Sequence, residues 1–174
     1  MAYLHVIDNH DASIRETAAT RTTESERIVL CVESAAEATA GLDRLVAENR
    51  RFDRVLFETH GAPGLIAFGS DGITGDWMRA NWAARNYAQL TLGFTRIYFN
   101  GCNVAAEERG WQFLEATANI FLSRGEVFGH TSVGLVLPIH SWLTGHVAHL
   151  TGQLRKVTKL PGDPVLMRTE RSDL

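Results

Sequence analysis

The chain has 174 residues and a formal net charge of −3, and no run of basic residues exceeds two, so non-specific nucleic-acid binding is not suggested. Hydrophobic residues make up 45% and charged residues 21% of the chain, which is typical of a globular domain and excludes a disordered or fibrous one. Two cysteines exclude a disulfide framework, and no apolar stretch approaches the ~20 residues of a membrane-spanning helix. We expect one domain over residues 1–174.

The N-terminal segment does not have the pattern of a signal peptide. Its sequence, MAYLHVIDNHD, lacks the basic start and the apolar middle of such a peptide. A methionine start without an export signal favours a cytoplasmic protein, which is our expectation. Secretion as part of a larger protein is also compatible with these features.

Two apolar runs near the N-terminus predict strands. The first covers residues 3–8 (YLHVID) and the second residues 27–32 (RIVLCV). The continuous apolar run of the second is typical of a strand covered on both faces, and it predicts Cys31 as a small buried thiol. The polar segment 9–26 between them is compatible with a short helix around residues 14–19 or with an exposed connection.

The second strand begins a predicted strand–helix–strand unit. Ser34 and Glu37 form a capping box that predicts a helix over residues 34–49, and its apolar residues recur at helical spacing. The next apolar run, residues 54–59, predicts a third strand. A βαβ connection of this kind makes the second and third strands parallel.

The chain after the third strand alternates between short elements. Residues 65–73, which contain the turn sequence Gly-Ser-Asp-Gly, predict a small β-hairpin outside the main sheet. A helix is expected from about residue 76 into the region of residue 87. Residues 95–100 predict a fourth strand, parallel to the third, and residues 107–122 predict a second long helix.

The C-terminal part gives fewer signals. Residues 126–129 predict a fifth strand, whereas residues 131–150 are compatible with a loop, a hairpin or an irregular helix. Residues 153–160 alternate like a half-exposed edge strand, and residues 161–174 carry too many turn formers and charges for an assignment. Together these patterns predict an α/β fold with a mostly parallel central sheet and helices on both faces.

His60 and Cys102 stand just beyond the ends of the third and fourth predicted strands. In an open parallel sheet, ligands bind at the carboxyl ends of the strands, and neighbouring strands lie about 4.8 Å apart. If these two strands are neighbours, the imidazole and the thiol meet. The pair then predicts a thiolate nucleophile with a histidine general acid or base, a chemistry to which a nearby helix N-terminus contributes.

Residues beside this pair complete the predicted site. Gly61 and Gly101 leave room for a substrate backbone, and the N–H groups of Gly61 and Cys102 are the expected oxyanion donors. Asn103 is expected to cap the following helix or to position its first turn. Trp142 is a candidate wall of the substrate pocket, because its segment follows the fifth strand.

Other polar residues allow further interpretations. His140, His146 and His149 resemble a metal site, but no cysteine or carboxylate cluster completes a zinc-like set nearby, so we expect no metal and no cofactor. Glu58 shares a strand face with His60, and it either orients the imidazole or, more often for such a residue, faces solvent or forms an ion pair.

Three acidic residues are candidates for recognising a basic substrate side chain: Asp71, Asp76 and Glu126. The sequence does not indicate which of them faces the cleft. The glycines of Gly69–Gly72 lack the strand–helix context and the lysine of a phosphate-binding loop, so no nucleotide site is expected.

Two sequence blocks resemble the caspase-like cysteine peptidases, the superfamily of caspases, gingipains, legumain and separase. VLFETHG and IYFNGCN match its strand ending in His-Gly and its strand ending in a small residue and Cys, in that order. The chain more closely resembles a bacterial family of caspase-like domains found at the front of large secreted adhesin-like proteins. That similarity covers roughly residues 4–134 and includes HGAPGLIAFG, NGCNVA and the early VID strand.

The resemblance implies a caspase-like three-layer sandwich and a cysteine endopeptidase that hydrolyses peptide bonds through a His60/Cys102 dyad. Gly101 departs from the Asp, Gln or Ala that many caspase relatives carry before the cysteine. One alternative is a catalytically inactive interaction module that binds a protein partner through the same cleft. Another is a different thiol acyl-transfer enzyme, such as an amidase. The expected partners are a peptide or protein substrate and a regulatory protein, with no nucleic acid or membrane.

Overall fold

The fold is taken from a computed structural model of the chain. The structure describes residues 2–19, 27–132 and 152–172. The elements in chain order are β1 (Tyr3–Asp8), α1 (Ala12–Ala19), β2 (Arg27–Val32), α2 (Ala35–Ala47), β3 (Phe52–Glu58), β4 (His60–Ala62), β5 (Leu65–Phe68), β6 (Asp71–Thr74), α3 (Gly75–Asn81), η1 (Ala83–Arg85), η2 (Tyr87–Leu90), β7 (Thr91–Phe99), α4 (Glu107–Phe121), β8 (Gly125–His130), β9 (Gln153–Lys159) and β10 (Met167–Ser172).

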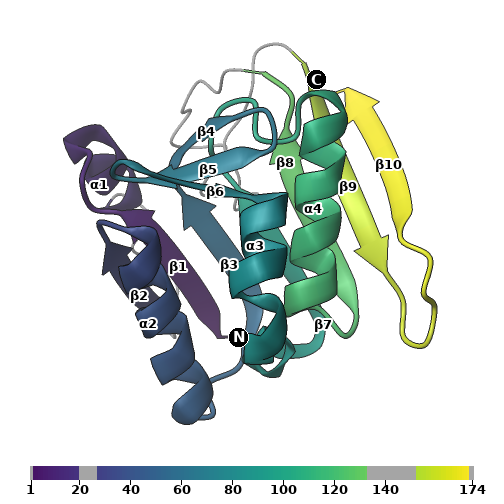
Figure 1. Cartoon of the computed structure of the whole chain (residues 1–174), viewed down its shortest axis with the longest axis horizontal. Helices are drawn as coiled ribbons and strands as arrows, with labels where there is room; N and C mark the ends of the chain where they lie inside the picture. The colour runs from purple at the N-terminus through teal and green to yellow at the C-terminus, as the bar shows by residue number, and fades with distance from the viewer. Residues whose placement is uncertain (1, 20–26, 133–151, 173–174) are drawn as a thin grey trace.

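A seven-stranded sheet forms the centre of the described fold, in the order β10-β9-β8-β7-β3-β1-β2 (Figure 1). The five strands from β8 to β2 in this order are parallel to one another, and β9 and β10 are antiparallel additions. A separate antiparallel sheet, β4-β5-β6, lies beside the carboxyl end of β3. The α/β class, the mostly parallel sheet and the hairpin over residues 65–73 are therefore confirmed.

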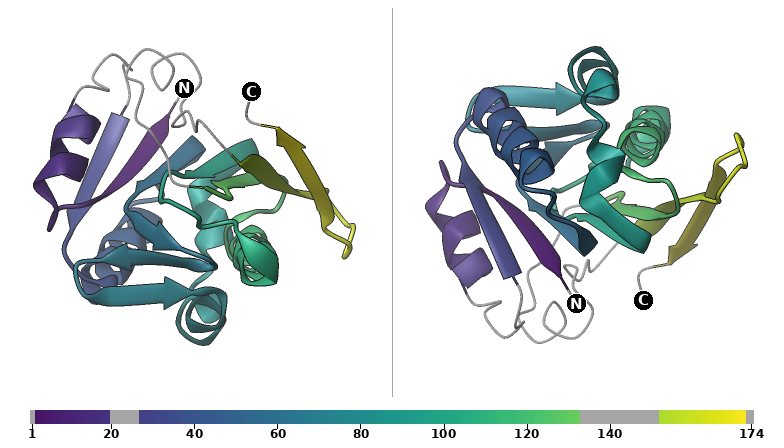
Figure 2. Two further views of the ribbon diagram at one scale, coloured as in Figure 1. Left: turned by 90° about the horizontal axis from the view of Figure 1, so that it is seen from above. Right: turned by 90° about the horizontal axis from the view of Figure 1, so that it is seen from below.

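Helices lie on both sides of the large sheet. The connections from β1 to β2 and from β2 to β3 run in opposite directions along the sheet, so right-handed crossovers place α1 and α2 on opposite faces. Figure 2 shows α2, α3 and α4 together on one side and α1 apart from them beside β2. This arrangement is that of a layered α/β sandwich.

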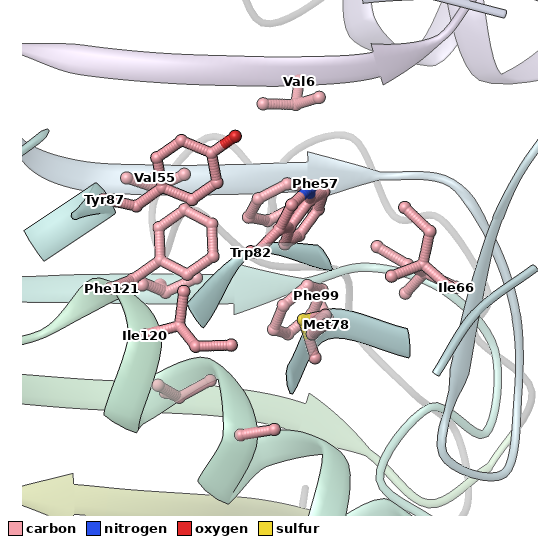
Figure 3. Close-up of a cluster of buried hydrophobic side chains, with 14 of the residues drawn as sticks. Val6, Val55, Phe57, Ile66, Met78, Trp82, Tyr87, Phe99, Ile120 and Phe121 are labelled. Atoms are coloured by element: carbon pink, nitrogen blue, oxygen red, sulfur yellow. The ribbon is translucent and has the colours of Figure 1, made fainter. Parts of the chain in front are cut away.

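The core lies between the sheet and the face formed by α2, α3 and α4 (Figure 3). Phe57 on β3 and Phe99 on β7 stack with ring centroids 4.9 Å apart, on adjacent parallel strands. Phe121, at the end of α4, packs edge-on against Phe57 and Trp82 and stacks on Tyr87. This aromatic cluster joins α4 and the segment after α3 to the two central strands.

Strand β2 corrects the expectation for residues 27–32. The strand is present, but it is the outer strand of the described sheet, with Val29 43% exposed and Cys31 exposed. The continuous apolar run therefore does not correspond to burial on both faces, and the prediction of a buried Cys31 is wrong. From Val29 to Val32, exposed and buried residues alternate, so only one face of β2 packs against the core. Hydropathy alone does not encode which face of a strand other elements cover.

The helix expected from residue 76 to residue 87 is shorter than predicted. α3 ends at Asn81, and two 3₁₀ turns follow it. Asn86 lies in the left-handed region (φ 57°), which breaks the helical path. Trp82 is buried and donates an indole N–H bond to Thr39 on α2, so tertiary packing fixes the chain where the helix stops.

The C-terminal strands also differ from the sequence interpretation. β9 confirms a strand over residues 153–159, but it lies between β8 and β10 and is not at the edge. The segment without a sequence assignment contributes β10, the outer strand on this side. Its polar sequence, MRTERS, lacks the apolar alternation that predicts a strand, because most of its side chains are exposed. For α1, the helical alternative was correct.

The aromatic cluster predicts a large stability cost for truncating Phe121, which is 1% exposed. Phe121→Ala is expected to lower the free energy of unfolding by roughly 3–5 kcal/mol, because it leaves a cavity among three aromatic rings. Urea denaturation measures this change. Leu92→Ala, at a side chain 40% exposed, is the control and should change stability by less than about 0.5 kcal/mol. Equal losses in the two variants would contradict this description of the core.

Candidate active site

The strands that carry the two sequence blocks are neighbours. β3 and β7 pair in parallel with Phe57 opposite Phe99, and the Asn100 N–H donates to the Phe57 carbonyl over 3.0 Å. His60 follows Phe57 by three residues, and Cys102 follows Phe99 by three residues. Both therefore lie at the same carboxyl edge of the sheet and at equivalent positions in the register, as the sequence interpretation required.

The glycines beside them bring the two backbones into contact. A Cβ atom on Gly61 would lie 2.7 Å from the Cys102 carbonyl oxygen and 3.0 Å from the Gly101 carbonyl carbon. A Cβ atom on Gly101 would lie 3.1 Å from the Gly61 Cα atom. A real Cβ does not tolerate the shortest of these separations, so the contact requires the absence of a side chain at Gly61. The structure thus brings together His60, Gly61, Gly101 and Cys102.

The loop after Cys102 is held from two sides. The Ala105 N–H donates to the His130 carbonyl on β8 (2.9 Å), and the Asn103 N–H donates to the Ser132 carbonyl (3.0 Å). On the other side, the Gly64 N–H in the hairpin donates to the carbonyl of Val104, whose side chain is fully buried (3.0 Å). These bonds fix the backbone that presents the partly exposed Cys102.

Asn103 does not cap α4, so the first of the two roles expected for it is wrong. The N-cap is Ala106, which makes no side-chain capping bond. Asn103 instead adopts the left-handed conformation (φ 57°), and its carbonyl accepts the Ala106 N–H over 2.8 Å. An asparagine suits this conformation, so its role in the loop is a turn that redirects the chain into α4.

His60 has a carboxylate partner that the sequence interpretation missed. Its Nε2 lies 2.9 Å from Oδ2 of Asp11, and its side chain is 63% exposed. The other carboxylate oxygen of Asp11 accepts the Ile14 N–H over 3.3 Å at the start of α1. An ionised carboxylate only accepts hydrogen bonds, so this contact assigns the proton to Nε2 and directs Nδ1 elsewhere.

Asp11 was detectable in principle from local sequence signals. It directly precedes α1, where a side chain that accepts from the first turn is favoured. It also follows β1, and β1 pairs with β3, so its segment leaves the sheet at the same edge as His60. Because the sequence of residues 9–26 is compatible with either a helix or an exposed connection, it does not by itself predict this position for Asp11.

Glu58 does not face solvent but is paired with a buried histidine, and this contact is an ion pair when the histidine is protonated. Glu58 is 4% exposed, and its Oε2 atom lies 2.7 Å from Nε2 of the fully buried His5 on β1. β3 ends at Glu58 and His60 begins β4 in the other sheet, so the shared strand face expected for these two residues does not extend to His60. His5 was not recognised from the sequence, because its neighbours give only a strand pattern.

The three acidic candidates for recognising a basic side chain lie in other contacts. Asp71 accepts the Ala35 N–H at the start of α2 over 3.0 Å. Asp76 forms an exposed pair with Arg79 on α3. Glu126 lies near the amino end of β8 and pairs with Lys156, away from the carboxyl edge that carries Cys102. None of these contacts connects to His60 or Cys102.

Several sequence predictions concern residues outside the described ranges. Trp142, the candidate pocket wall, and His140, His146 and His149 lie there. Within residues 2–19, 27–132 and 152–172, no group of three or more His, Cys, Asp or Glu side chains is arranged to hold a metal ion. In the same ranges, no helix combines the length and apolar character needed to cross a bilayer.

The fold and this arrangement define an α/β domain with a cysteine and a histidine at adjacent strand ends. The chain belongs to a family described as a domain of unknown function (DUF4347), whose sequence profile matches residues 5–124. The matched region contains most of β1, the His60 block, the hairpin, the Cys102 block and α4. No curated protein and no solved structure matched the chain in these comparisons.

The backbone contact predicts an asymmetric response to alanine at two glycines. Gly61→Ala is expected to lower the free energy of unfolding by roughly 1–3 kcal/mol, because its methyl group collides with the Cys102 loop backbone. Gly72→Ala in β6 is the control, because there the nearest atom is the end of the flexible Leu65 side chain at 2.9 Å. Denaturation midpoints measure both changes, and a larger loss at Gly72 would refute the contact.

Proposed function

We propose that this domain is a caspase-like cysteine endopeptidase that hydrolyses peptide bonds through His60 and Cys102. The observation that carries the proposal is the equivalent placement of the two residues past β3 and β7, together with the Gly61–Gly101 contact between their loops. Both side chains are accessible, since His60 is exposed and Cys102 is partly exposed. The layered sheet and the hairpin after His60 support the caspase-like form of the sandwich.

The chemistry proceeds through an acyl-enzyme. The Cys102 thiolate attacks the peptide carbonyl carbon, and the C–N bond breaks as His60 donates a proton to the leaving amine. Water, deprotonated by His60, then attacks the thioester, which releases the carboxylic acid and returns the thiol. The N–H groups of Gly61 and Cys102 are the proposed donors to the developing oxyanion. Asn103 lines the proposed substrate path beside the thiol, whereas Gly101, expected to leave room for the substrate, is buried against Gly61.

Asp11 gives the imidazole a defined orientation in this scheme. By accepting the Nε2 proton, it leaves Nδ1 as the nitrogen that exchanges protons with the sulfur and the leaving group. It also stabilises the imidazolium that forms when His60 takes up a second proton. A carboxylate that holds a histidine in this way acts as a positioning residue rather than as a reacting group.

Cleavage of a peptide library tests the proposal directly. Wild-type chain and Cys31→Ser are expected to cleave with the same specificity, and Cys102→Ala is expected to have no measurable turnover. Cys31 is a suitable control because it is an exposed thiol on the outer strand β2, remote in the sheet order from β7. Mass spectrometry of the products identifies the cleaved bonds.

Each other outcome argues for a different function. If no peptide is cleaved and Cys102→Ala retains its fold and binds a partner like wild type, the domain is a caspase-like interaction module. If small amides are hydrolysed but peptides are not, the domain is another thiol acyl-transfer enzyme. Cleavage that persists in Cys102→Ala contradicts the assignment of the nucleophile.

Substitutions of His60 and of its partner Asp11 should reduce activity by different amounts. His60→Ala is expected to lower kcat/KM by roughly 100- to 10,000-fold, the usual contribution of general acid–base catalysis. Asp11→Asn should cause a smaller loss, mainly in kcat, because it changes the orientation of the ring without removing it. The loss should be larger for Asp11→Asn than for Asp76→Asn, an exposed pair partner on α3. Equal activity of Asp11→Asn and wild type would refute the positioning role.

A further inference from the structure

A second cluster of residues lies on the sheet face turned away from α4. Ile97 and Val127 belong to the core under the helices, whereas the adjacent Tyr98 and Phe128 belong to a separate buried cluster. Alternation along each strand therefore places Tyr98 and Phe128 on the opposite face. Their rings stack with centroids 4.8 Å apart and form an aromatic floor across the neighbouring strands β7 and β8.

A cavity of about 420 Å³ opens on this floor. Strands β7, β8, β9 and β10 all contribute to its wall, so four neighbouring strands define it. The lining residues are Arg96, Tyr98, Glu126, Phe128, Leu154, Lys156, Thr169 and Arg171. Its size is within the lower range of small-molecule sites.

The charge of this cavity is opposite to that of the chain. Three of its lining residues are basic and one is acidic, an excess of two positive charges in a chain whose net charge is −3. The acidic residue, Glu126, is shared between Lys156 at 2.8 Å and Arg96 at 3.4 Å. One carboxylate cannot neutralise both cations together with Arg171, so the cavity has positive charge in excess.

The strand register concentrates this charge. Arg54 on β3 lies directly opposite Arg96 on β7, and both side chains share the face of Tyr98. Like charges at directly opposed positions destabilise a sheet, and Glu126 offsets part of this repulsion at Arg96. Burial raises the pKa of the Tyr98 hydroxyl, which Arg54, Arg96 and Arg171 surround closely enough to oppose that rise. The hydroxyl therefore remains a hydrogen-bond donor at neutral pH.

We propose that this cavity binds a small organic dianion, either a phosphate monoester or a dicarboxylate. Arg96, Lys156 and Arg171 supply the charge, the Tyr98 hydroxyl donates a hydrogen bond, and Phe128 and Leu154 pack against the apolar part of the ligand. Tyr98 lies on β7, whereas Cys102 follows the end of that strand, and the residues that line the cavity include neither His60 nor Cys102. The inference does not depend on peptidase activity.

Calorimetric titration of the chain with phenyl phosphate, inorganic phosphate and succinate tests this site. At low ionic strength, phenyl phosphate or succinate is expected to bind with one-to-one stoichiometry, and salt should weaken the binding. Stronger binding of phenyl phosphate identifies an ester as the ligand class, and stronger binding of succinate identifies a dicarboxylate. Inorganic phosphate should bind more weakly than phenyl phosphate, because it lacks the apolar part.

Two substitutions should act in opposite directions. Arg171→Gln is expected to weaken binding by roughly tenfold or more, the usual effect of losing a charged hydrogen bond. Glu126→Gln should strengthen it, because the competing carboxylate is removed, and a partly unfolded variant would not do so. Arg44→Gln, at an exposed residue of α2 on the other face, is the control and should have no effect.

The proposal is overturned by any of three results. These are no saturable binding of any of the three probes to the wild-type chain, an equal loss in Arg171→Gln and Arg44→Gln, and binding that Glu126→Gln leaves unchanged or weaker.

Discussion

The close backbone contact between Gly61 and Gly101 is the constraint on which the site depends. It occurs because β3 and β7 pair in parallel and release their chains at the same edge of the sheet. A side chain at Gly61 would separate the two loops, and the histidine and cysteine beside these glycines would then diverge. Phe57 and Phe99, each three residues before His60 and Cys102, stack in the core and fix the register of β3 against β7. The same strand pairing therefore determines both the core packing and the geometry of the site.

The sequence predicted the parts of this arrangement that depend on local patterns. The apolar runs before His60 and Cys102 indicated buried strands, and the capping box at Ser34 indicated α2, whose N-cap accepts the Glu37 N–H. The turn glycines indicated the hairpin. Crossover rules indicated that β3 and β7 run parallel, whereas their adjacency was a condition of the predicted site that the structure meets. The family match covers these same blocks but carries no function with it.

The errors concern features that depend on tertiary neighbours. β2 is exposed on the face that carries Val29 and Cys31, and β9 is internal because the polar segment that forms β10 pairs with it. Asp11 reaches His60 across a separation of 49 residues, and no periodic pattern signals such a contact. The basic cavity likewise combines residues from four strands. No single strand sequence indicates that these residues line a common cavity. The sheet thus has clusters of polar side chains both at its carboxyl edge and on the face turned away from α4.

The reactivity of Cys102 toward iodoacetamide tests the central claim most directly, because it measures coupling between the thiol and the imidazole without a known substrate. Both cysteines are at least partly accessible, so accessibility alone favours the exposed Cys31. Peptide mapping after brief labelling should show that Cys102 reacts faster than Cys31, and that His60→Ala removes this difference while leaving Cys31 unchanged. If Cys102 reacts no faster than Cys31, or at the same rate with and without His60, the two residues are not a catalytic pair.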